Sequence, residues 1–248
     1  MRVILGAILW ASIACAVILY GQPASVRIER VMGPEVPTGR YKHPASITEL
    51  DNGDLYIAYL LPVYRETGEP NLVGADTCSL FLRFDPETKK WSETNRVYSR
   101  LGNLQPSVAQ IDENYLIAYC RRGADYKPRI DGYMVRTESR DGGRTWSEGQ
   151  ETEFPNPNAA VEFIKLHSGN LLLVYNDSMS SRTPLTVAIS TDHGKTFPHR
   201  RNIGEGENSF AYPYAIQTRD GKIRVVYTSD RRSVINMAVF EEGLILGK

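Results

Sequence analysis

The sequence predicts an all-β protein, a β-propeller whose blades are four-stranded antiparallel sheets. Four segments share one pattern, a β-alternating run, a tight turn and a second run that ends in tyrosine. A second motif, in which an aspartate turn precedes an aromatic residue, follows at a similar spacing. Beyond the N-terminus no segment has a sustained helical period, and glycine and proline fall between the apolar runs. A hairpin that recurs every 50–60 residues is typical of a propeller.

The four repeated units are the first half of each predicted blade. They occupy residues 46–59, 107–119, 161–175 and 215–227. Their turns are Asn52-Gly53, Glu113-Asn114, Ser168-Gly169 and Asp220-Gly221. Residues of these types accept the positive φ that tight hairpins need. The closing tyrosines recur in phase, which indicates packing residues: Tyr59, Tyr119, Tyr175 and Tyr227.

An aspartate turn motif belongs to the second half of the units. The pattern S-x-D-x-G-x-T-W/F occupies residues 139–146 and recurs 51 residues later at 190–197, and residues 85–91 form a degenerate copy. An aspartate that closes a turn, a glycine at positive φ and an aromatic at the sheet edge make a self-contained hairpin. We therefore expect these aspartates to be structural and not catalytic.

The last unit has no fourth strand of its own after residues 237–240. The isolated alternating segment 25–31 is expected to supply that strand and so to close the ring. Four units of this length predict four blades in a single domain, residues 25–248.

The N-terminal segment indicates export. Arg2 precedes residues 3–20, an uncharged apolar stretch in which Ser12 is the polar interruption, and small residues follow it. This order is typical of a secretory signal peptide, here residues 1–24, and predicts a periplasmic or extracellular protein. An uncleaved membrane anchor is the alternative, because a stretch of this length lies within the range that spans a bilayer.

Composition and cysteine content limit the partners and cofactors. The 248 residues are 42% hydrophobic and 23% charged with zero formal net charge, which excludes a disordered chain and predicts no nucleic-acid partner. No cluster has metal-ligand spacing, so we expect neither a metal nor a cofactor. Cys78 and Cys120 can form one disulfide in an exported chain or remain buried thiols on separate strands.

Together these motifs resemble the sialidase (neuraminidase) superfamily, particularly bacterial BNR-repeat, exo-α-sialidase-like proteins. The S-x-D-x-G-x-T-W/F pattern is the Asp box of that superfamily, and the resemblance covers residues 40–242, most closely 156–240. The family fold is a six-bladed propeller, whereas four units are recognisable here. The resemblance implies a glycoside hydrolase that acts on terminal acidic sugars of glycans.

The resemblance also implies an arginine-rich catalytic site, since guanidinium groups bind carboxylates through paired hydrogen bonds. Arg121, with Arg122 as the alternative, stands at the family's second arginine position, and Arg182 stands at the third. Tyr212 resembles the nucleophile, with Tyr214 a close competitor.

Several positions depart from the family pattern. Lys42 stands where the family has its first arginine, and Gln105 lies near the position of the glutamate that activates the tyrosine. Thr228 replaces the acidic residue that braces the first arginine. Lysine lacks the planar fork of arginine, and glutamine cannot accept a proton. The acid/base residue is one of three in the loop of the first unit, namely Glu66, Glu69 and Asp76.

The first strand of every propeller blade faces the central channel, so the residues that open each unit converge at one mouth. This adds a set of candidate substrate-binding residues, which are His43, Arg122, Asn156, Asn158, Glu162 and Tyr214. Asn156 and Asn158 can equally be turn formers, and Glu162 can be one partner of a structural pair. The expected pocket is cationic and rich in hydroxyl and amide groups, which suits an acidic sugar.

Two functions from different classes fit these observations. The first is a secreted sialidase-like glycoside hydrolase, and the second is a glycan-binding propeller without turnover, which Gln105 and Thr228 favour. A structural interaction module is a third reading, and it predicts that Arg121, Arg182 and Tyr212 do not converge.

Overall fold

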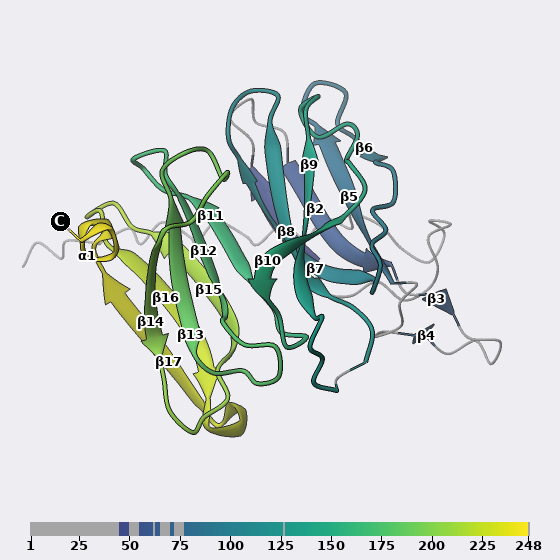
Figure 1. Cartoon of the computed structure of the whole chain (residues 1–248). Helices are drawn as coiled ribbons and strands as arrows, with labels where there is room; N and C mark the ends of the chain where they lie inside the picture. Colours follow the sequence, from purple (N-terminus) through teal and green to yellow (C-terminus); the bar gives the residue numbers. More distant parts are fainter. Residues whose placement is uncertain are drawn as a thin grey trace, which may run out of the picture. The chain divides into compact units, whose positions relative to one another are not determined.

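A computed structural model describes residues 77–247 except Tyr126, together with the backbone of four earlier strands (Figure 1). These earlier strands are β1 (Ala45–Glu49), β2 (Leu55–Leu61), β3 (Val63–Tyr64) and β4 (Pro70–Asn71). All described residues belong to one compact unit, Met32–Lys248. The predicted signal segment and the predicted closing strand at residues 25–31 lie outside the described residues.

The strands form four larger antiparallel sheets, one for each repeated unit, and β3 and β4 form a separate two-stranded sheet (Figure 1). The first sheet has the order β1-β2-β5-β6, with β5 at Cys78–Asp85 and β6 at Lys90–Glu93. The second consists of β7 (Asn103–Gln110), β8 (Leu116–Arg122), β9 (Tyr133–Ser139) and β10 (Gln150–Pro155). The third consists of β11 (Glu162–Lys165), β12 (Leu171–Asn176), β13 (Leu185–Ser190) and β14 (His199–Gly204). The fourth has three strands, β15 (Ala211–Gln217), β16 (Ile223–Ser229) and β17 (Val234–Phe240).

The predicted all-β class and the four-stranded antiparallel sheets are confirmed. The first strands of successive sheets contact one another in order, since β7 lies against β1 and β2, β11 against β7, and β15 against β11. In the part of the chain that the structure describes, no strand joins the fourth sheet to the first. The closed four-bladed ring therefore stays a prediction.

Apolar side chains fill the spaces between the sheets. Phe81 of the first sheet stacks on Trp146, which lies between β9 and β10 of the second sheet, with ring centroids 4.0 Å apart. Tyr119 of the second sheet meets Phe163 of the third edge-on, with centroids 4.8 Å apart. Tyr119 and Tyr175 are fully buried in this cluster, which confirms their predicted packing role.

The Asp boxes form the predicted turns. Asp141 Oδ1 accepts hydrogen bonds from the backbone N–H groups of Arg144 and Thr145, both at 2.9 Å, and Oδ2 accepts one from Thr145 Oγ1 at 2.7 Å. Asp192 makes the same contacts with Lys195 and Thr196. Because both carboxylates are hydrogen-bonded within their own turns, the prediction that these aspartates are structural is confirmed.

Three further observations concern the cysteines and helices. Cys78 and Cys120 are buried free thiols, so the second of the two predicted alternatives is correct. A short helix, α1 (Glu242–Leu246), and a 3₁₀ turn, Asp230–Arg232, were not expected, because each is too short to produce a helical period. Among the described residues, no helix is long and apolar enough to cross a membrane.

Candidate functional site

Two of the first strands contain a bulge directly before a proline. Gln105, in β7, has a φ of 51°, and the pairing register shifts between Leu104 and Pro106. Tyr212, in β15, has a φ of 52°, and the register shifts between Ala211 and Tyr214. A bulge turns a side chain away from the regular alternation, and left-handed residues other than glycine are found mostly where function or local structure requires them. Both side chains are predicted site residues.

Arg121 lies at the end of β8 and is buried, with 4% of its surface exposed. Its Nη1 donates a hydrogen bond to Gln105 Oε1 at 2.7 Å, and its Nε donates to Asn158 Oδ1. Asn158 is itself left-handed, with a φ of 58°, and its Nδ2 donates to the carbonyl of Asp125 at 2.9 Å. These two amide oxygens orient the guanidinium without neutralising its charge.

Two more arginines flank Tyr212. The guanidinium carbon of Arg182 lies 5.7 Å from the centre of the Tyr212 ring, and that of Arg232 lies 5.3 Å from it. Arg182 Nη2 also donates to the carbonyl of Asn158 at 3.2 Å, which connects this pair to Arg121. Among residues 77–247, neither Arg182 nor Arg232 forms an ion pair with a carboxylate.

The charges around Tyr212 change its acidity. Burial raises the pKa of Tyr212, but the positive charges of Arg232, Arg182 and Arg121 outweigh that effect and hold the pKa below its ordinary value. Arg232 follows Asp230 and Arg231 in a turn where all three residues have positive φ, and this turn directs its side chain onto the ring. The phenol is therefore more readily ionised than an isolated tyrosine.

The structure thus brings together five of the predicted residues, which are Gln105, Arg121, Asn158, Arg182 and Tyr212. Arg232 was missed, because a pair of arginines at a strand end is usually solvated. One signal for it exists in the sequence, since Arg231-Arg232 follows the fourth unit much as Arg121-Arg122 follows the second.

The other candidates have structural environments. Arg122 donates to four backbone carbonyls, those of Gly123, Asp125, Lys127 and Asn156, at 2.8–3.2 Å. The Asn156 side chain closes its own turn onto Ala159, so the turn-former reading fits it. Tyr214 is 59% exposed, and its partner in the pairing of β15 with β16 is Val226. Ligand contacts by Arg122, Asn156 and Tyr214 remain predictions without further support.

Glu162 lies where three first strands meet. Its Oε2 accepts a hydrogen bond from Ser107 Oγ of β7 at 3.2 Å, and its Oε1 lies 3.5 Å from the backbone N–H of Ala215 in β15. Burial raises the pKa of Glu162 to about 7, despite the opposing effect of these two donors. The structural reading of this residue therefore fits better than direct contact with a sugar.

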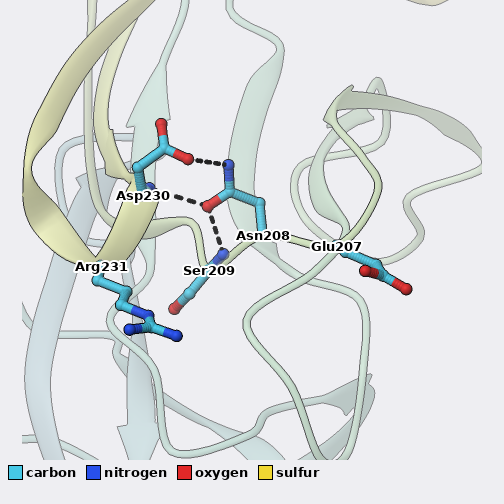
Figure 2. Close-up of a pocket in the computed structure, with 5 residues that line it drawn as sticks. All are labelled: Glu207, Asn208, Ser209, Asp230 and Arg231. Atoms are coloured by element: carbon cyan, nitrogen blue, oxygen red, sulfur yellow. Dashed lines mark hydrogen bonds between the residues drawn. The ribbon is translucent and has the colours of Figure 1, made fainter.

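A cavity of about 480 Å³ lies beside the turn that carries Arg232. Its lining residues come from the segments before β15 and after β16, and they are Glu207, Asn208, Ser209, Asp230 and Arg231 (Figure 2). Asn208 Oδ1 accepts hydrogen bonds from the backbone N–H groups of Ser209 at 2.7 Å and Asp230 at 2.9 Å. The volume lies within the range of small-molecule sites, and all five lining residues are of polar or charged types.

Five predicted site residues lie outside the described residues. They are Lys42, His43 and the three acid/base candidates Glu66, Glu69 and Asp76. Among the residues that are described, no group of three or more metal-ligating side chains occurs.

Comparison with known families decides the relationship of the chain. The sequence pattern of the BNR repeat-like domain matches residues 37–225, most of the chain. The chain belongs to this family. The predicted membership in the BNR-repeat proteins is thereby confirmed, and no curated protein sequence matches this BNR repeat-like protein.

Solved structures of sialidases share the fold of this BNR repeat-like protein. The NanB sialidase of Streptococcus pneumoniae has a TM-score of 0.62 and 16% identity, over 83% of this chain and 32% of that one. The Hadza microbial sialidase Hz136 has a TM-score of 0.60 and 17% identity, over 82% and 38%. The intramolecular trans-sialidase of Ruminococcus gnavus has a TM-score of 0.57 and 16% identity, over 84% and 44%. The chain spans less than half the length of each of these structures.

Proposed function

We propose that this BNR repeat-like protein is an exported glycosidase of the exo-α-sialidase type, which acts on the terminal acidic sugars of glycans. The observation that carries the proposal is the convergence of Arg121, Arg182 and Arg232 around Tyr212. The solved sialidases with the same fold support the same substrate class. Export rests on the apolar N-terminal segment of the sequence.

The three guanidinium groups supply the chemistry that a carboxylated sugar requires. Arginine binds a carboxylate through forked, charge-assisted hydrogen bonds, and Arg182 and Arg232 have no acidic partner among the described residues. Arg121 is already oriented by Gln105 and Asn158. In this proposal the carboxylate of the sugar lies against the arginines, and the anomeric carbon of the sugar faces the phenol of Tyr212.

Tyr212 is the proposed nucleophile. Its oxygen bonds to the anomeric carbon as the glycosidic bond breaks, and the leaving oxygen takes a proton from an acid, for which Glu66, Glu69 and Asp76 are the candidates. Water then cleaves the sugar–tyrosine bond with the same residue as base. A neutral phenol avoids the repulsion that a carboxylate nucleophile would meet beside an anionic sugar. Gln105 cannot take the phenol proton, so in this proposal the proton passes to solvent water as the sugar–tyrosine bond forms and returns when that bond is cleaved. The neighbouring arginine charges favour this loss because they lower the pKa of Tyr212.

A glycan-binding protein without turnover is the second candidate. The specific observation in its favour is the Gln105 amide, whose oxygen binds Arg121 at the place where a proton acceptor is expected. The same arginine group would then hold the acidic sugar without cleaving its linkage.

The test measures release of 4-methylumbelliferone from its α-sialoside by protein that lacks residues 1–24. We expect turnover by the parent, loss of turnover in Tyr212→Phe and Arg182→Ala, and normal turnover in the matched control Tyr98→Phe, which changes an exposed tyrosine between β6 and β7. Absence of turnover, with sialic acid still raising the melting temperature of the parent but not of Arg182→Ala, would establish the binding protein. If the parent shows neither turnover nor stabilisation by sialic acid, both candidate functions are refuted for that sugar.

A further inference from the structure

The turn that places Arg232 against the Tyr212 ring has an unfavourable backbone. Asp230, Arg231 and Arg232 have φ angles of 47°, 55° and 72°. In a residue other than glycine the left-handed region brings Cβ close to the following carbonyl oxygen, so such residues normally occur singly and not in a row. A backbone of this kind persists only where surrounding contacts hold it. The hydrogen bonds to this turn therefore decide where Arg232 lies.

The side chain of Asn208 holds the first residue of that turn. Its Oδ1 accepts a hydrogen bond from the backbone N–H group of Asp230 at 2.9 Å, and its Nδ2 donates one to Asp230 Oδ1 at 3.0 Å (Figure 2). The same Oδ1 accepts from the N–H group of Ser209 at 2.7 Å. Asn208 is itself anchored, because its backbone N–H group donates to the carbonyl of Gly206 at 2.9 Å. One amide thus binds both the backbone and the carboxylate of Asp230.

These contacts connect the segments that meet at the phenol. Asn208 lies in the segment that leads into β15 and Tyr212, whereas the turn of Arg232 joins β16 to β17. In the same segment as Asn208, the backbone N–H group of Phe210 donates to the carbonyl of Arg182 at 2.8 Å. The chain before Tyr212 is therefore hydrogen-bonded to the turn of one flanking arginine and to the backbone of the other.

Asn208 also binds a carboxylate that stands close to Arg232 in the sequence. Asp230 Oδ1 accepts from Asn208 Nδ2, and Asp230 Oδ2 accepts from Ser229 Oγ at 3.0 Å. In the described part of the chain, Asp230 and Arg232 do not form an ion pair. An arginine that is paired with a carboxylate stabilises a neighbouring phenolate less, because the two charges oppose each other. The amide of Asn208 therefore leaves the charge of Arg232 available to the phenol.

We propose that Asn208 is a positioning residue, which holds the Asp230 turn so that the guanidinium of Arg232 lies against the Tyr212 ring. Asn208 acts through Arg232 and does not itself contact the sugar. Its importance for sugar cleavage rests on the proposed function, whereas its effect on the phenol of Tyr212 does not.

Titration of the Tyr212 phenol tests the proposal without a substrate. The full chain is labelled with carbon-13 at the hydroxyl-bearing carbon of tyrosine, and the NMR signal that disappears in Tyr212→Phe is assigned to this residue. In the parent, burial raises the pKa of the phenol, but the charges of Arg232, Arg182 and Arg121 outweigh it, so we expect a pKa below the ordinary value. Asn208→Ala should raise this pKa toward the value of Arg232→Ala. The double variant should titrate like Arg232→Ala alone, because both changes act on the same charge.

Ser209→Ala is the matched control. Ser209 is the next residue and lines the same cavity, but it contributes only its backbone N–H group to the Asn208 amide. This variant should titrate like the parent. If Asn208→Ala does not fold, Asn208→Ser replaces it with the same expected result, because serine is too short to bind both the backbone and the carboxylate of Asp230. A folded Asn208 variant whose phenol titrates like that of the parent overturns the proposal. So does a double variant whose pKa lies above that of Arg232→Ala, since Asn208 would then act independently of Arg232.

Hydrolysis of the α-sialoside separates this proposal from the proposed function. If the parent turns the substrate over, Asn208→Ala should raise KM about tenfold, as Arg232→Ala should, because a charge-assisted contact with the sugar carboxylate is weakened. If the proposed function fails, turnover is absent but the Asn208 variant still shifts the pKa of Tyr212. If the positioning role fails, the parent still hydrolyses the sialoside and the pKa does not shift.

Discussion

Replacing Glu162 with glutamine should remove a pH dependence of stability that the parent protein has. The carboxyl group is held among three strands by Ser107 and Ala215, and its pKa is raised to about 7 from 4.5. A group with a raised pKa in the folded state binds its proton more tightly there than in the unfolded chain. The free energy of unfolding should therefore fall as pH rises from about 4.5 through 7.

The size of this loss follows from the shift. At 1.36 kcal/mol for each unit of pKa, the parent should lose on the order of 3 kcal/mol across that window. Glutamine has nearly the same shape, and it can accept from the Ala215 N–H group while its own amide donates to Ser107 Oγ. The Glu162→Gln variant should match the parent near pH 4 and exceed its stability by about 3 kcal/mol at pH 8.

Urea unfolding at pH 4, 6 and 8 measures the difference directly, with Glu148→Gln as a control at an exposed position. Comparison of the two variants with the parent cancels the contributions of all other titrating groups. Identical pH profiles for the parent and Glu162→Gln would show that the carboxyl is solvated in the folded protein, and the reasoning from burial would then be wrong.

Three further predictions concern the framework of the sheets. Asp192→Ala should lower the free energy of unfolding by about 2 kcal/mol, because its turn loses several hydrogen bonds to one carboxylate; an unchanged urea midpoint would contradict this. Phe163→Ala should cost about 3–5 kcal/mol in the same assay, because it opens a cavity in the aromatic cluster between the second and third sheets. In protein that lacks residues 1–24, Cys78 and Cys120 should react with Ellman's reagent only after unfolding, since both are buried; rapid reaction of the native protein would contradict their burial.

The sheets were predictable because their signals are local. The alternating runs and the turns at Ser168-Gly169 and Asp220-Gly221 specify hairpins whichever sheet lies next to them. The Asp box likewise carries all of its hydrogen-bond partners within a few residues, as Asp141 shows. Packing roles at Tyr119 and Tyr175 follow from the phase of the repeat.

The site was predictable only in part. The direction of a side chain depends on the local backbone conformation, which the pattern of residue types in the sequence does not reveal. Arg121 and Arg122 are neighbours on one strand and therefore point to opposite faces, yet the sequence could not say which of them faces Asn158. Arg232 reaches Tyr212 through a turn of three left-handed residues, and a D-R-R sequence does not favour such a turn.

The residues at the centre of the site are those that break the regularity of their strands. Gln105 and Tyr212 would lie on a sheet face if β7 and β15 kept their alternation, but each occupies a left-handed bulge before a proline. Proline cannot donate to the sheet ladder, so the pairing is interrupted there without leaving a buried N–H group unsatisfied. The same local structure, a left-handed bulge followed by proline, occurs in β7 and in β15. It directs the Gln105 amide and the Tyr212 phenol toward the arginine group. Strained backbone of this kind persists only where surrounding contacts hold it, and here Arg121 holds Gln105 directly while Arg182 and Arg232 flank the ring of Tyr212.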